Sequence, residues 1–145
     1  MKLRSVTRRC VVVAIVMTIT AISSGCGLTV NPDARPLSGE WIGTYTCGQG
    51  LTGLTLTMTG HASGAVDAIF SFYPIPENPS IPSGSSTKRG VYLIGGGLNL
   101  ESGAWIDQPL GYQMVDMIGI VSPDKTTYSG TLDNYHCTTF YVTRQ

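Results

Sequence analysis

Hydrophobic and polar residues alternate with a period of two along several short stretches of the chain. In the clearest of them, residues 54–59, Leu54, Leu56 and Met58 alternate with three threonines. Residues 66–73 continue the same alternation after a glycine-containing turn. This period is typical of a half-buried strand, because successive side chains point to opposite faces of a sheet. We therefore expect both stretches to be strands with one face in a core.

Turn residues divide the rest of the chain into similar short segments, and no helical periodicity follows residue 26. Regularly spaced short strands of this kind predict an all-β sandwich or barrel. The sequence favours a small antiparallel up-and-down β-barrel of about eight strands closed by a disulfide. The expected strands cover residues 39–48, 54–59, 66–73, 90–94, 98–100, 114–121, 127–132 and 136–143.

The first 25 residues are typical of a removable export signal. Four basic residues precede an apolar run over residues 10–22, which is shorter than the ~20 residues that a membrane-spanning helix needs. Ser23-Ser24-Gly25-Cys26 resembles a bacterial lipobox, in which the cysteine becomes the lipidated first residue. The alternative is cleavage by an ordinary signal peptidase, which leaves Cys26 as a free or paired thiol.

The resulting organisation has three parts. Residues 1–25 are the signal, residues 26–37 are a lipidated tether with little apolar content, and residues 38–145 are the β-barrel domain. We expect the protein to be exported and anchored to the cell membrane by lipid at Cys26, with the domain on the extracytoplasmic side.

The cysteines predict how the domain is closed. Cys10 lies in the signal and Cys26 is the lipid site, so Cys47 and Cys137 remain as one pair in an oxidising compartment. If that pair joins the first and last strands in register, Glu40 faces Arg144 as an opposite-charge pair and Gly43 faces Tyr141. Pairing the first strand with the last removes free sheet edges.

The charge of the domain argues against a nucleic-acid partner. Although the whole chain is neutral, the signal holds four of the nine basic residues and none of the nine acidic ones. The remainder is therefore mildly acidic, without the basic stripe that phosphate recognition requires.

Gly39-Glu40-Trp41 and Arg144 resemble the end motifs of calycins, the lipocalin and avidin-like barrels, which implies a structural role for Trp41 and Arg144 at one barrel end. The fuller pattern W-x-G-x-Y-x-C-x-Q-G at residues 41–50, with C-x-x-F-x-V-x-R at 137–144, is similar to a recurrent group of small exported bacterial lipoprotein β-domains. That group carries no assigned activity.

Tyr45-x-Cys47 with the late Cys137 also resembles lipoprotein inhibitors of lysozyme, but their Ser-Gly-x-x-Tyr loop has no match after Ser63-Gly64.

The sequence carries no recognisable motif of catalysis or metal binding. His61 and His136 are the only histidines, and neither G-x-S-x-G nor H-E-x-x-H occurs. With one cysteine pair committed to a disulfide, no tetrahedral zinc site is expected. We expect no enzyme activity, no metal and no cofactor.

Two long connections, residues 74–86 and 101–112, are the expected contact surface, although they would also serve simply to cover the barrel ends. The leading hypothesis is a lipid-anchored binding module without catalysis, whose partner is an envelope protein, a glycan or a phage component. The alternatives are a calycin-like carrier of a small apolar ligand and an inhibitor of a cell-wall hydrolase such as lysozyme. The expected contact residues are Pro76, Asn78, Pro79, Pro82, Trp105, Ile106, Pro109 and Tyr112.

Overall fold

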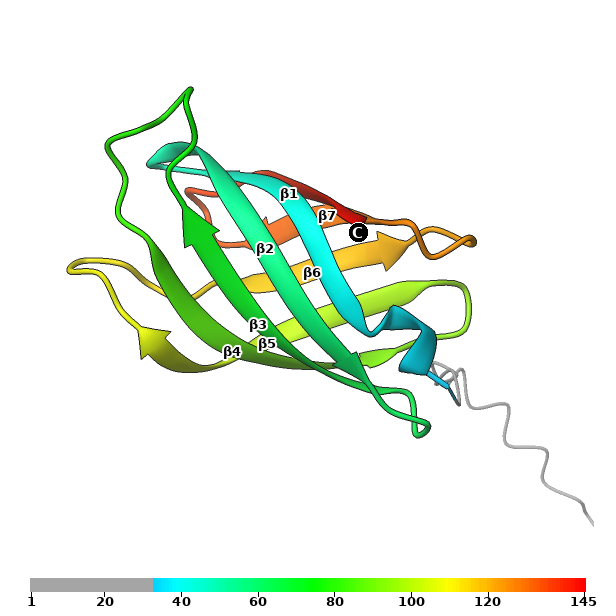
Figure 1. Cartoon of the computed structure of the whole chain (residues 1–145). Helices are drawn as coiled ribbons and strands as arrows, with labels where there is room; N and C mark the ends of the chain where they lie inside the picture. Colours follow the sequence, from blue (N-terminus) through cyan, green and yellow to red (C-terminus); the bar gives the residue numbers. More distant parts are fainter. Residues whose placement is uncertain (1–32) are drawn as a thin grey trace, which may run out of the picture.

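A computed structural model describes residues 33–145 as one closed antiparallel β-barrel (Figure 1). Each strand pairs with the next along the chain, and the last pairs back with the first, so the prediction of an eight-stranded up-and-down barrel is confirmed. A short 3₁₀-helix, η1 (Arg35–Leu37), precedes the barrel. The strands are β1 (Gly39–Cys47), β2 (Gly50–Gly60), β3 (Ala65–Tyr73), β4 (Gly84–Tyr92), β5 (Gly97–Asp107), β6 (Asp116–Val121), β7 (Thr127–Asp133) and β8 (Thr139–Arg144).

The predicted alternation places side chains inside and outside the barrel. Leu54, Leu56 and Met58 of β2 are buried, whereas Thr57 and Thr59 between and after them are exposed. The same alternation on the neighbouring strands fills the interior with aliphatic and aromatic groups. An eight-stranded barrel has an interior just wide enough for side chains or one small ligand.

One end of the barrel is closed by η1. Leu37 is fully buried there, and its carbonyl oxygen accepts a hydrogen bond of 3.0 Å from the indole Nε1 of Trp41. Ala34 is buried as well, so the packed domain includes residues 34–37, which the sequence assigns to the tether. Figure 1 shows η1 beside the start of β1, at the opposite end from the β1–β2 turn.

The predicted register between the first and last strands is wrong by one residue. Trp41 lies opposite Arg144, and Gly43 lies opposite Val142 instead of Tyr141. The prediction assumed that Cys137 belongs to the last strand, but β8 begins only at Thr139. Cys137 precedes the strand in a turn, so the disulfide does not set the strand register.

The expected connections at 74–86 and 101–112 are shorter than predicted. β4 begins at Gly84 and β5 continues to Asp107, so the second prediction is wrong for residues 101–107. Residues 101–107 do not alternate cleanly between buried and exposed side chains. β5 pairs with β6 only over Gly97–Leu100, and beyond that point it pairs with β4 alone, with two irregularities in the register. The segment that connects β5 to β6 therefore covers residues 108–115.

Candidate functional site

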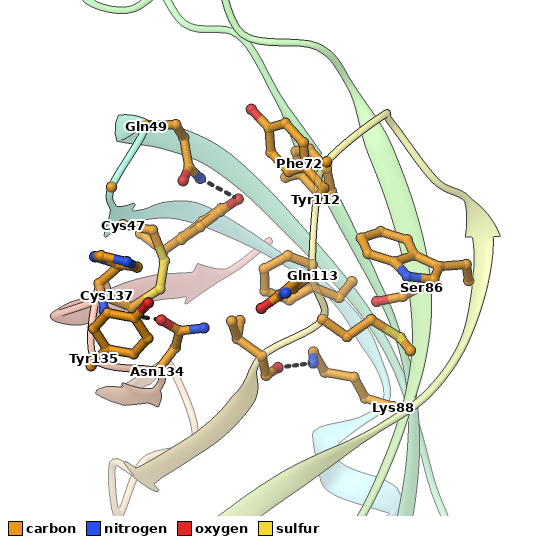
Figure 2. A pocket seen from close by; sticks show the side chains of 18 residues that line it. Cys47, Gln49, Phe72, Ser86, Lys88, Tyr112, Gln113, Asn134, Tyr135 and Cys137 are labelled. Carbon is orange, nitrogen blue, oxygen red and sulfur yellow. Dashed lines mark hydrogen bonds between the residues drawn. A yellow bond between two sulfur atoms is a disulfide. The ribbon is translucent and has the colours of Figure 1, made fainter.

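A cavity of about 600 Å³ opens at the end of the barrel opposite η1. Its walls come from the end of β1 and the β1–β2 turn, the second half of β3, the first half of β4, the far end of β5, the 108–115 connection and the turn before β8. These segments are distant in sequence and meet only because the barrel closes. We call this cavity the barrel mouth; Figure 2 shows the side chains that line it.

Three aromatic side chains form the floor of the barrel mouth. Tyr45 of β1 and Phe70 of β3 have ring centroids 5.3 Å apart, and Phe72 lies 6.3 Å from Phe70. All three are buried and point inward, an arrangement that fills the middle of the barrel but leaves the space above them open. Gln49 donates a 3.0 Å hydrogen bond to the Tyr45 hydroxyl, and burial raises the pKa of that phenol.

Two more aromatic residues form one wall. Tyr112 stacks on Phe72 with a centroid distance of 5.2 Å and an interplanar angle of 10°, and Trp105 meets the same ring edge-on at 6.4 Å. The side-chain amide of Gln108 donates to the backbone oxygen of Tyr112 at 3.1 Å, which fixes the 108–115 connection in this position. The barrel mouth is therefore rich in aromatic surface that a flat or apolar ligand can contact.

Lys88 is the one charged side chain among the buried residues that the structure describes, with 2% of its surface exposed. Its ammonium donates to Ser102 Oγ at 3.2 Å and to the backbone oxygen of Val115 (Figure 2), and it lies 4.9 Å from the Phe70 ring centroid. Burial lowers its pKa to about 8, against an opposing effect of the Asp116 carboxylate.

The Asp116 carboxylate does not form an ion pair with Lys88. Instead its Oδ1 accepts a 2.8 Å hydrogen bond from the backbone N–H of Ser102. Burial acts to raise the pKa of Asp116, but the bonds from Ser102 and the nearby Lys88 charge bring it below the usual value. Within residues 33–145, Lys88 takes part in no salt bridge.

The rim of the barrel mouth holds the disulfide. Cys47 and Cys137 are bonded, as predicted, and both line the cavity. Next to them the rings of Tyr135 and His136 lie 3.8 Å apart, and both residues are exposed. The bond therefore ties the end of β1 to the turn before β8 at the rim.

The structure separates the contact residues predicted from the sequence into two groups. Trp105 and Tyr112 are half-buried in the wall of the barrel mouth, whereas Pro109, also half-buried, is not among the residues that line it. Ile106, the next residue along β5, is exposed and lies outside the cavity. The Trp105 ring is thus neither a free surface anchor nor a plug; it is a wall of an open cavity.

The proline-rich connection does not line the barrel mouth. Pro76, Pro79 and Pro82 are exposed. Asn78 donates from Nδ2 to the backbone oxygens of Gln49 at 2.7 Å and Leu51 at 3.1 Å, so it clamps this connection onto the β1–β2 turn. Its contacts are therefore structural.

Sequence reasoning missed Lys88 as a site residue. A signal was present, because Lys88 has the same parity along its strand as the buried Ser86 and Tyr92. A lysine at an inward position of a strand is unusual, because lysine side chains are almost never fully buried without a partner. Reading that parity required knowing where β4 begins.

Comparison of the chain with protein-family models, curated proteins and solved structures finds no match. Within residues 33–145, no group of three or more His, Cys, Asp or Glu side chains is placed to hold a metal ion. The same residues include no helix that is long and apolar enough to cross a membrane. The predicted lipid site, Cys26, lies outside the described residues.

Proposed function

We propose that this chain is an exported, lipid-anchored envelope protein without catalytic activity, and that its domain binds a small, largely apolar molecule in the barrel mouth. The single observation that supports this proposal best is the cavity of about 600 Å³ with aromatic walls. Ligand pockets of proteins have volumes of ~300–1,000 Å³ and combine apolar walls with a few polar groups. This is the calycin-like carrier that the end motifs suggest as an alternative.

The arrangement of the rings supports an internal ligand over a purely external partner. Tyr45, Phe70 and Phe72 point inward, yet they form only the floor, and the space above them stays open to solvent. Tyr112 and Trp105 line this space and are half-buried. A bound apolar molecule would cover these rings and gain from the removal of apolar surface from water.

One observation favours the second candidate, a protein partner on the outer rim. Leu110 is fully exposed and Ile106 is 57% exposed, both beside the barrel mouth. Exposed apolar side chains near a ligand site are suited to contact with a partner that delivers or receives the ligand. Two isolated residues make a weaker surface than five converging rings, so we place the internal site first.

To test for an internal ligand, the full-length protein is isolated from the envelope and extracted with organic solvent, and the co-purified molecules are identified by mass spectrometry. A pocket variant, Trp105→Ala with Tyr112→Ala, is compared with a rim variant, Ile106→Ala with Leu110→Ala. We expect a molecule that the wild type and the rim variant retain and the pocket variant loses. Loss of a bound partner in the rim variant, with no molecule in any preparation, would favour the outer surface instead.

A further inference from the structure

We propose that the ligand of the barrel mouth is an amphipathic organic anion, whose carboxylate or similar acidic group binds the ammonium of Lys88 while its apolar body lies against the aromatic wall. This inference rests on the proposed function and assigns the ligand class. Three observations support it: the position of Lys88, the third N–H donor of its ammonium, which has no oxygen acceptor among the described residues, and the distribution of charge around the cavity.

Lys88 is incompletely satisfied by the protein. An ammonium group has three N–H donors. Two of them have oxygen acceptors, Ser102 Oγ and the Val115 backbone oxygen, and the described residues offer no third acceptor and no ion pair. The Phe70 ring, 4.9 Å away, is the remaining neighbour. A buried charge is costly without an opposite charge, so an anion that reaches this position would stabilise both groups.

The charge around the cavity suits an anion. No aspartate or glutamate occurs among the described residues that line the barrel mouth, whereas Lys88 does. The domain outside is acidic, with all nine carboxylate side chains of the chain located after residue 32. The one nearby carboxylate, Asp116, does not line the cavity and is hydrogen-bonded to the Ser102 N–H, so Lys88 is the charged side chain that the cavity presents to a ligand, which favours anionic over cationic ligands.

The aromatic wall determines the rest of the ligand. The Tyr112 and Trp105 rings lie 5.2 Å and 6.4 Å from the Phe72 ring, and all three residues line the barrel mouth together with Lys88. A molecule with a flat or apolar body and one acidic end would place the body against these rings and the acid on the ammonium. A simple inorganic anion would leave the rings uncovered.

The surroundings of Lys88 predict how binding depends on pH. The groups that face the ammonium are Phe70 from β3, Ser102 from β5, Val115 from the 108–115 connection and Asp116 from β6. Among these, Asp116 is the charged side chain, and it stays ionised above neutral pH because its pKa is lowered. Anion binding should therefore weaken as the pH rises through the pKa of Lys88, about 8.

The test uses three probes with one body: 4-biphenylcarboxylate, 4-biphenylmethanol and 4-biphenylmethylamine, titrated calorimetrically into the full-length protein. Lys88→Met removes the ammonium at similar size. Arg89→Met is the matched control, because Arg89 is the next residue on β4, carries the same charge and points outward to Asp67 at 3.1 Å. Lys88→Arg keeps the charge.

We expect the wild type and Arg89→Met to bind the carboxylate about ten- to a hundredfold more tightly than the alcohol, with the amine weakest. Lys88→Met should lose this preference but still bind the alcohol, and Lys88→Arg should retain the preference. Equal binding of carboxylate and alcohol by the wild type, unchanged by Lys88→Met, would overturn the anion assignment and leave the proposed function intact. Absence of binding by all three probes would overturn both.

Discussion

Arg144 lies directly opposite Trp41 across the seam where β8 meets β1, and both side chains hold the same short helix. The guanidinium donates to the backbone oxygens of Pro36 at 2.6 Å and Ser38 at 2.9 Å, while the indole donates to Leu37. Trp41 and Arg144 therefore link the seam between β1 and β8 to η1, the helix that closes this end of the barrel. These hydrogen bonds are the contacts behind the structural role that the sequence predicts for Trp41 and Arg144.

Arg144→Ala should lower the free energy of unfolding by about 1–3 kcal/mol, because it removes two charge-assisted hydrogen bonds, one to the Pro36 oxygen in η1 and one to the oxygen of Ser38, the residue that follows η1. Thermal melting followed by near-UV circular dichroism measures the change. Binding in the barrel mouth, at the other end of the barrel, should be unaffected. Loss of binding at unchanged melting temperature would mean that Arg144 belongs to a functional site.

Gly43→Ala should destabilise the seam severely, by roughly 3 kcal/mol or more. A β-carbon at this position would lie 2.0 Å from the backbone oxygen of Tyr141 and 2.8 Å from the Val142 Cα. Gly48→Ala is the control, since its β-carbon would meet only His136 at 3.6 Å, an ordinary contact. Urea denaturation of both variants compares them; equal stabilities would contradict the close approach of β1 and β8.

The disulfide should contribute roughly 4–5 kcal/mol by restricting the unfolded chain, since its cysteines are separated by 90 residues. The expected loss applies to the double variant Cys47→Ser with Cys137→Ser, measured by urea denaturation. Peptide mapping without reductant should recover the two cysteine peptides linked. Recovery of both as free thiols would contradict this bond.

Lys88 should make the protein more stable as the pH rises from 8 to about 10. Its pKa is about 8 in the folded state against 10.5 for an unperturbed lysine, because burial disfavours the charge. Between these values the unfolded chain binds more protons than the folded one, so stability increases with pH. The full difference corresponds to roughly 3 kcal/mol.

Urea denaturation at pH 7.5, 9 and 10 measures this effect. Lys88→Met should abolish the rise, whereas Arg89→Met should keep it because Arg89 is exposed on the outer face. If the stability of Lys88→Met rises with pH by the same amount, titratable groups other than Lys88 cause the effect.

Cys26→Ser should release the protein from the membrane fraction or block its processing, if Cys26 is the lipidated residue of the lipobox-like sequence. Cell fractionation with detection of the protein by gel mobility distinguishes these results. A variant that stays in the membrane fraction with wild-type mobility would contradict lipid anchoring at this residue.

Local patterns were sufficient to predict the number of strands and the positions of most of them, but not the bounds of β4 and β5. The alternation of Leu54, Leu56 and Met58 with threonines reflects which face of a strand is buried, and that is a property of neighbouring residues. Turn residues marked where strands end, and Cys47 and Cys137 were the remaining pair after export was inferred. These features depend on short-range geometry or on simple counting, so they can be read directly.

The site depended on contacts between distant segments, which a single sequence does not contain. Cys137 lies one turn before β8, so the disulfide could not reveal the strand register. β5 continues past Leu100 only because it follows β4, which brings Trp105 to Phe72. Lys88 reaches the cavity floor because β4 begins at Gly84, and the tertiary structure alone decides its burial, since Ser102, Val115 and Phe70 come from three other segments.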